Sequence, residues 1–220
     1  MKNLLYLTIL FFWIPFAEGQ FVDKRDYIFL IDASASMAGK EQGSVNIIPK
    51  VRVALEEYAK TIPIGSRVVV MPFSDVIMDR FDITIKTTQD ITQLQEYFMS
   101  IDPTGRRTFI YRSLGETEKI AKEMNGINSP RQQHILLYTD GRDNDPARRS
   151  MDNQMELFSR MRRDNNKLFL FYYTLGVDLP EEEKQTFQVL QTAGSGSRFW
   201  GNKIQSDPQS HTHPCPIIPH

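Results

Sequence analysis

The alternation of short apolar runs with segments of helical periodicity constrains this chain more than any other feature of its sequence. The apolar runs are typical of strands buried on both faces, and they span residues 27–31, 67–71, 134–138 and 168–175. Apolar side chains recur at helical spacing over residues 45–61, 91–98, 110–124 and 151–161. This alternation predicts right-handed crossovers and a doubly wound α/β fold, with a mainly parallel central sheet and helices on both faces.

One further strand breaks the parallel pattern. Residues 76–86 alternate apolar and polar side chains and follow the 67–71 strand after only a tight turn at Ser74 and Asp75. A parallel connection needs a dozen or more residues, so we expect this strand to be antiparallel and to form an edge of the sheet. A helix beginning near Asp178 and a last strand within 194–204 complete the predicted order.

The two ends of the sequence differ from the domain between them. Residues 1–19 combine Lys2, an apolar run and small residues at Ala17 and Gly19, which predicts a signal peptide. That apolar run is too short for a bilayer span of about 20 residues, and no other stretch could span a membrane. We therefore expect one domain over 20–205, a Pro- and His-rich extended tail over 206–220, and a secreted or periplasmic location.

Charge and cysteine content exclude several kinds of function. The formal net charge of -1 argues against electrostatic binding of nucleic acid. A single cysteine, Cys215, rules out an intramolecular disulfide and a cysteine-based zinc cage. In the tail, His211, His213 and Cys215 alternate in a way that would allow weak Zn²⁺ or Cu²⁺ binding, and Cys215 could instead pair with another chain. The sequence does not predict an oligomeric state.

Polar residues gather where the predicted strands end. Asp32, Ser34 and Ser36 follow the first strand, and Asp140 follows the 134–138 strand. Thr108 lies just before the 110–124 helix. In an open α/β sheet ligands bind outside the carboxyl ends of the strands, so these residues should converge there.

Hydroxyls and carboxylates without histidine or thiol suit hard cations such as Mg²⁺, Mn²⁺ or Ca²⁺. Two carboxylates about 5 Å apart would repel by roughly 3 kcal/mol at an effective dielectric of 20, and a cation removes that repulsion. Without a cation, a raised carboxyl pKa is expected. The alternative is that Ser34 and Ser36 only cap the next helix, while Asp32 and Asp140 are solvated turn residues.

These residues together resemble a known motif. Asp32-Ala-Ser34-Ala-Ser36, Thr108 in Thr-Phe-Ile-Tyr-Arg-Ser-Leu, and Thr139-Asp140-Gly141 are similar to the metal-ion-dependent adhesion site (MIDAS) of von Willebrand factor type A (vWA) domains. The resemblance covers about residues 25–205 and includes Met-Pro-Phe-Ser-Asp at 71–75 and Tyr-Thr-Leu-Gly-Val-Asp at 173–178. It implies a three-layer Rossmann-like fold with one divalent cation, Mg²⁺ or else Mn²⁺ or Ca²⁺.

The resemblance also implies what the site does. Ser34, Ser36 and Thr108 would contact the ion directly or through water, and Asp32 and Asp140 would often act through waters. The open coordination position would take a carboxylate from a protein partner, as in adhesion. A displacement of the last helix, about 180–191, on binding would also follow from the resemblance.

Two departures from the family pattern bear on the site. Ala35 stands where many members have glycine, and its methyl would crowd the loop if that position needed a positive φ. The segment Thr104-Gly-Arg-Arg stands where a Gly-Gly pair is common, which leaves Thr104 as a rival to Thr108. The spacing downstream of Thr108 favours Thr108.

Two interpretations of the surrounding residues stay open. Arg106, Arg107 and Arg142 flank the predicted site and would either steer an anionic partner or be solvated loop charges. The alternative function is a Mg²⁺-dependent hydrolase or phosphotransferase with Asp32 as nucleophile. That chemistry lacks a second aspartate two residues on, where Ser34 stands, and no general base falls among the strand-end residues, so we expect a binding module rather than an enzyme.

Overall fold

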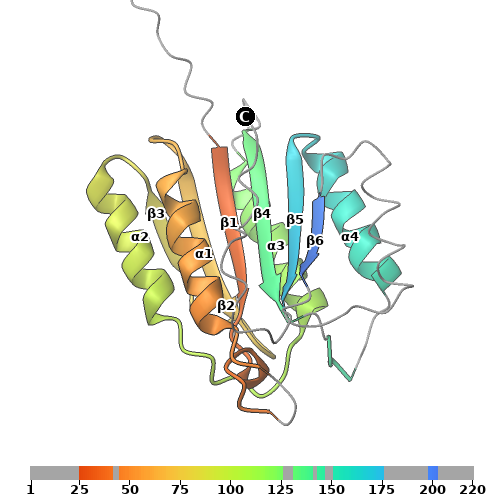
Figure 1. The fold of residues 1–220 in the computed structure, drawn as a ribbon. Helices are drawn as coiled ribbons and strands as arrows, with labels where there is room; N and C mark the ends of the chain where they lie inside the picture. The colour runs from red at the N-terminus through yellow and green to blue at the C-terminus, as the bar shows by residue number, and fades with distance from the viewer. Residues whose placement is uncertain are drawn as a thin grey trace, which may run out of the picture.

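A six-stranded mixed sheet forms the centre of the molecule (Figure 1). The computed structural model describes residues 25–41, 45–125, 131–140, 143–146, 151–175 and 198–202. Within them the strands are β1 (Arg25–Asp32), β2 (Arg67–Phe73), β3 (Phe81–Thr84), β4 (Gln132–Thr139), β5 (Leu168–Leu175) and β6 (Arg198–Asn202). The helices are η1 (Ala35–Met37), α1 (Ile48–Lys60), α2 (Thr88–Ser100), α3 (Ile110–Met124) and α4 (Met151–Asp164).

The strand order is β3-β2-β1-β4-β5-β6, and every neighbouring pair is parallel except β2 and β3. The chain passes from β1 outward to β2 and β3, then returns to place β4 on the other side of β1. The order therefore reverses between β1 and β4, which is the point where open α/β sheets bind ligands. The predicted doubly wound fold with one antiparallel edge strand is confirmed.

Helices cover both faces of the sheet, as Figure 1 shows. Tyr27, Phe29 and Ile31 of β1 lie in a core shared with α1 and α2. Ile28 and Leu30 point to the opposite face and lie in the core shared with α3 and α4. Because successive side chains of β1 are buried on alternate faces, the strand is continuously apolar from Tyr27 to Ile31.

The structure corrects two predicted boundaries. The edge strand is only Phe81–Thr84, because the chain before it folds into a turn in which Met78 N–H donates to the Pro72 carbonyl at 2.9 Å. The second helix is longer than 91–98 and begins at Thr88. Its start is fixed by a capping box in which the Thr87 backbone N–H donates to the Asp90 carboxylate at 2.7 Å.

Three predictions fall outside the described residues. They are the signal peptide over 1–19, the helix beginning near Asp178 and the tail over 206–220 with His211, His213 and Cys215. Within the described parts of the chain, no helix combines the length and hydropathy that a bilayer crossing requires.

Candidate metal centre

The predicted site residues come from the two strands that meet at the reversal of strand order. Asp32 is the last residue of β1, and the register that pairs Ile31 with Tyr138 sets it beside Thr139, the last residue of β4. Asp140 follows directly. Both carboxylates therefore lie at the carboxyl edge of the sheet, where sequence reasoning placed them.

Asp32 is fully buried, at 0% exposed. The Ser34 backbone N–H donates to its Oδ1 at 2.9 Å, and the Thr139 hydroxyl donates to its Oδ2 at 2.7 Å. Burial and, to a smaller extent, the charge of Asp140 raise the pKa of Asp32, these hydrogen bonds oppose the shift, and the resulting pKa is about 7. Asp140 is 9% exposed, so neither aspartate is the solvated turn residue of the alternative interpretation.

Ser34 and Ser36 point toward one another. Their Oγ atoms lie 2.9 Å apart, with Ser34 buried and Ser36 half-buried. Ser34 occupies the N-cap position of η1 but makes no side-chain capping bond, and α1 begins after Ile47, again without a side-chain cap. The serines therefore do not serve as helix caps. Ala35 lies in the 3₁₀ helix η1, where φ is negative, so its methyl is accommodated without strain.

Thr108 lies between the loops that follow β2 and β4. Its N–H donates to Asn144 Oδ1 at 2.6 Å, and its carbonyl accepts from the Asn144 backbone N–H at 3.0 Å. On the other side the Phe109 N–H donates to the Ser74 carbonyl at 2.8 Å. Thr108 is 2% exposed, whereas Thr104, its rival in sequence, is exposed on the surface of the loop.

Gly105 explains how the bulkier Thr104-Gly-Arg-Arg loop fits. Its carbonyl accepts from the Ala35 N–H at 2.6 Å, and its N–H donates to the Ala33 carbonyl at 3.0 Å, so the loop pairs with the segment after β1. A Cβ at this position would lie 2.2 Å from Ser74 Cβ. Only glycine allows this approach, and Arg106 and Arg107 after it remain exposed.

The residues present suit a hard cation. Five side chains supply oxygen only, and in the described part of the chain no lysine or arginine forms an ion pair with Asp32. No group of three His, Cys, Asp or Glu side chains able to hold a metal occurs among the described residues. The predicted donor set is of a different kind, since it has only two carboxylates and is completed by hydroxyls. Arg142 lies outside the described residues.

Sequence reasoning missed two residues that hold the site together. The sequence indicates Thr139 only as part of the Thr-Asp-Gly motif, yet its hydroxyl donates a hydrogen bond to Asp32. The signal that could have identified it is a hydroxyl directly after the apolar run 135–138. Asn144 was not identified at all, and no spacing rule would have found it, because its contact with Thr108 joins residues 36 apart in the sequence.

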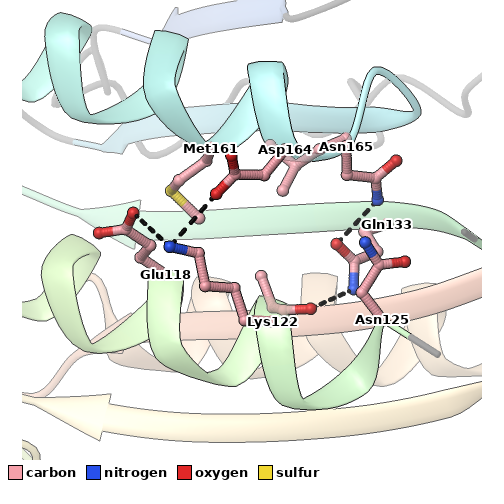
Figure 2. A pocket seen from close by; sticks show the side chains of 9 residues that line it. Glu118, Lys122, Asn125, Gln133, Met161, Asp164 and Asn165 are labelled. Atoms are coloured by element: carbon pink, nitrogen blue, oxygen red, sulfur yellow. Dashed lines mark hydrogen bonds and ion pairs between the residues drawn. The ribbon is translucent and has the colours of Figure 1, made fainter. Parts of the chain in front are cut away.

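A small pocket with a cavity volume of about 10 Å³, open to solvent, lies between α3 and α4 (Figure 2). Two of its amides are already paired: Gln133 Nε2 donates to the Ala121 carbonyl at 2.8 Å, and Asn165 Nδ2 donates to Gln133 Oε1 at 3.0 Å. Lys122 at its mouth pairs with Glu118 and Asp164. The pocket is smaller than ordinary small-molecule sites of about 300–1,000 Å³, so we assign it no ligand.

The fold and the oxygen-lined strand ends define a Rossmann-like α/β domain with a candidate cation site at its switch point. The family model for the von Willebrand factor type A domain matches residues 27–142, just over half of the sequence. The chain belongs to the von Willebrand factor type A domain family. No curated protein sequence matches it.

Solved structures share the fold at low sequence identity. An aerotolerance-related membrane protein from Bacteroides fragilis is 13% identical, with a TM-score of 0.51 and coverage of 82% of this chain and 92% of that chain. Manganese-loaded TRAP from Plasmodium vivax is 17% identical, with a TM-score of 0.51 and coverage of 81% and 69%. The pilus adhesin SpaC from Lactobacillus rhamnosus GG is 13% identical, with a TM-score of 0.57 and coverage of 84% and 28%.

Proposed function

We propose that this vWA domain binds one divalent cation, Mg²⁺ or else Mn²⁺ or Ca²⁺, and uses it to bind a protein partner. The hydroxyls of Ser34, Ser36 and Thr108 and the carboxylates of Asp32 and Asp140 would hold the ion. One observation carries the proposal: a fully buried aspartate lies within reach of the charge of Asp140, and its hydrogen bonds from the described residues come from neutral donors. A cation from solution supplies the missing positive charge.

The chemistry of the donor set indicates what the bound ion would do. The direct ligands would be three neutral hydroxyls, with the two carboxylates often acting through waters, so the ion would stay electrophilic and seek a further anionic ligand. An acidic side chain on a partner supplies one. The exposed Arg106 and Arg107 lie in the same loop as Thr108 and would attract such a partner.

Two of the similar structures support this function. TRAP of Plasmodium vivax is described as manganese-loaded, so this fold holds a divalent cation in that protein. SpaC is described as a pilus adhesin. We propose an analogous adhesion or interaction role for this chain outside the cytoplasm, reached through the signal peptide over 1–19 and exerted by the domain over 20–205.

The geometry favours binding over catalysis. Asp32 would be the nucleophile of a hydrolase, yet it is fully buried and each of its carboxylate oxygens accepts a hydrogen bond. A nucleophile must be reachable by its substrate, and Asp32 presents no exposed surface. We therefore propose an interaction module and not a phosphoryl-transfer enzyme.

Isothermal titration with Mn²⁺ and Mg²⁺ tests the cation site. We expect one site per chain, and Asp140→Ala should weaken binding by more than about tenfold, since even outer-shell changes have effects of that size. Asp102→Ala, which removes an exposed aspartate from the loop after α2, is the matched control and should bind as wild type does. Full binding by Asp140→Ala with an intact fold would contradict the assignment.

A second experiment tests the partner. The domain is incubated with extracellular or envelope fractions, with and without EDTA. A bound protein should be lost in EDTA and with Asp140→Ala but retained with Asp102→Ala. Capture that is insensitive to both treatments would mean that the partner binds elsewhere.

A further inference from the structure

Asn144 holds the Thr108 backbone at two points. Its side-chain Oδ1 accepts from the Thr108 N–H at 2.6 Å, and its own backbone N–H donates to the Thr108 carbonyl at 3.0 Å. These two bonds join the loop that follows Asp140 to the loop that carries Thr108. We call this pair of bonds the Asn144 clamp.

The residues on either side of Asn144 reinforce the same connection. Asp143 Oδ2 accepts from the Tyr111 N–H at 3.2 Å, in the first turn of α3. Asp145 is 5% exposed and forms a bidentate pair with Arg112, with Nε–Oδ2 at 2.7 Å and Nη2–Oδ1 at 3.1 Å. Three consecutive residues therefore attach the loop after β4 to the segment running from Thr108 into α3.

The clamp leaves Thr108 little freedom of its own. Its following residue is fixed to the loop after β2, through the Phe109 N–H and the Ser74 carbonyl at 2.8 Å. The position of the Thr108 hydroxyl relative to Asp140 is thus set by the loop that begins at Asp140 itself. Two ligands from distant parts of the sequence are held as one unit.

We propose that Asn144 is a positioning residue that fixes Thr108 relative to Asp140 and thereby sets the affinity of the site for its cation. This inference rests on the proposed cation-binding function. Asn144 would not contact the ion. It acts through Thr108, as outer-shell partners do when they orient a metal ligand, and such partners typically change affinity by about 10–100-fold.

Asn144 is exposed, so its side chain contributes little to the packed core. Removing it should therefore affect the position of Thr108 without unfolding the domain. Asn144→Ala deletes the Oδ1 acceptor and keeps the backbone donor. Asn144→Asp retains an acceptor oxygen at the same place and is the conservative variant. Asn166→Ala, in the exposed turn between α4 and β5, is the matched control.

The first readout needs no metal. Amide hydrogen exchange in EDTA reports whether the Thr108 N–H is held by Asn144. In Asn144→Ala this amide should exchange at least about threefold faster, and in Asn144→Asp and Asn166→Ala it should exchange as in wild type. An unchanged rate in Asn144→Ala would overturn the clamp, whether or not the domain binds a cation.

The second readout is Mn²⁺ affinity by titration, with urea unfolding as the check on the fold. Asn144→Ala should bind about tenfold more weakly than wild type, whereas Asn144→Asp should stay within about threefold or bind more tightly. Wild-type affinity in Asn144→Ala would overturn the positioning role. No binding by the wild-type domain would instead contradict the proposed function, and the hydrogen-exchange result would still decide the clamp.

A double-mutant cycle separates positioning from general structural damage. If Asn144 acts through Thr108, then Asn144→Ala should add less than about a twofold loss of affinity in a Thr108→Ala background. A full, additive loss in that background would show that Asn144 acts by another route and would overturn the inference.

Discussion

β1 carries a buried aspartate near each end, and the two carboxylates lie in opposite electrostatic surroundings. Asp26 and Asp32 are both 0% exposed. At the amino edge, Asp26 Oδ1 lies 3.1 Å from Arg67 Nε and 2.9 Å from Arg131 Nε, so two guanidinium groups face its charge. At the carboxyl edge, Asp32 meets neutral donors and the carboxylate of Asp140.

The difference indicates which edge is structural and which is functional. A buried charge costs several kcal/mol unless it is paired, so a fold that needs only stability pairs it internally. The arginines do so at the amino edge and tie β1 to β2 and β4. The described residues supply no such partner for Asp32. The carboxyl edge therefore lowers the stability of the metal-free domain, and the proposed cation would restore that stability on binding.

Removing the ion pairs of Asp26 at the amino edge should cause the largest loss of stability. Asp26→Ala leaves Arg67 and Arg131 without their carboxylate, and we expect a loss of about 4 kcal/mol in the free energy of unfolding, measured with urea. Mn²⁺ affinity of the folded variant should not change, because Asp26 lies at the opposite edge of the sheet. Asp82→Ala, which removes an exposed pair with Arg80, is the control and should cost below about 1 kcal/mol. Equal losses for the two variants would contradict the comparison.

The carboxyl edge should make metal-free stability fall as the pH rises. Folded Asp32 keeps its proton up to a pKa of about 7, whereas the unfolded chain releases it near 3.8. Between these values the folded state binds more protons, so rising pH destabilises it. From pH 5 to pH 8, where the carboxyl is ionised in both states, we expect a loss of about 3 kcal/mol in the free energy of unfolding. Below about 3.8 both states are protonated and the contribution is constant.

Urea unfolding in EDTA at pH 5 and pH 8 measures this effect. The window avoids Glu118, whose pKa is held at about 2 by Arg160 and whose contribution to stability is lost only in acid. The amide side chain introduced by Asp32→Asn cannot ionise, so this variant should show a flatter dependence of stability on pH. For the wild-type domain at pH 8, added Mg²⁺ should restore the stability that is lost in EDTA. The same slope in Asp32→Asn as in wild type would assign the dependence to another group.

Much of the fold could be predicted because its signals are local. The apolar run of β5 predicted the strand Leu168–Leu175 at the observed boundaries, and helical spacing predicted α3. The start of α2 and the short extent of β3 were not predicted. They depend on the Thr87–Asp90 capping box and on the turn before β3, which outweigh the apolar pattern near element ends.

The candidate site was predictable only as a set of strand-end side chains. Parallel strands bring their carboxyl ends to one edge, so Asp32 and Asp140 could be placed from sequence. The contacts that shape the site could not. Gly105 against Ser74 and Asn144 against Thr108 join separate loops, and their geometry depends on how those loops pack in three dimensions.

The two edges also differ in how they are held together. Ion pairs join the strands at the amino edge, whereas at the carboxyl edge the backbone of Gly105 packs closely against the loops that follow β1 and β2. In Gly105→Ala the new methyl would lie 2.2 Å from Ser74 Cβ and 3.2 Å from the Ala33 carbonyl oxygen. The loop must move away from β1, at a cost of about 2 kcal/mol in the free energy of unfolding. Since Gly105 is three residues from Thr108, Mn²⁺ affinity should fall as well.

A compensating variant shows whether the clash is the cause. Ser74→Gly removes both the Cβ and the Oγ that a methyl at position 105 would meet, and it keeps the carbonyl that accepts from the Phe109 N–H. The Gly105→Ala, Ser74→Gly double variant should therefore lose less stability than the sum of the two single variants. Gly115→Ala is the control: a Cβ there meets nothing within 4 Å, and alanine is the better helix former, so α3 should be stabilised slightly. Strictly additive losses would mean that position 105 needs glycine for a reason other than its approach to Ser74.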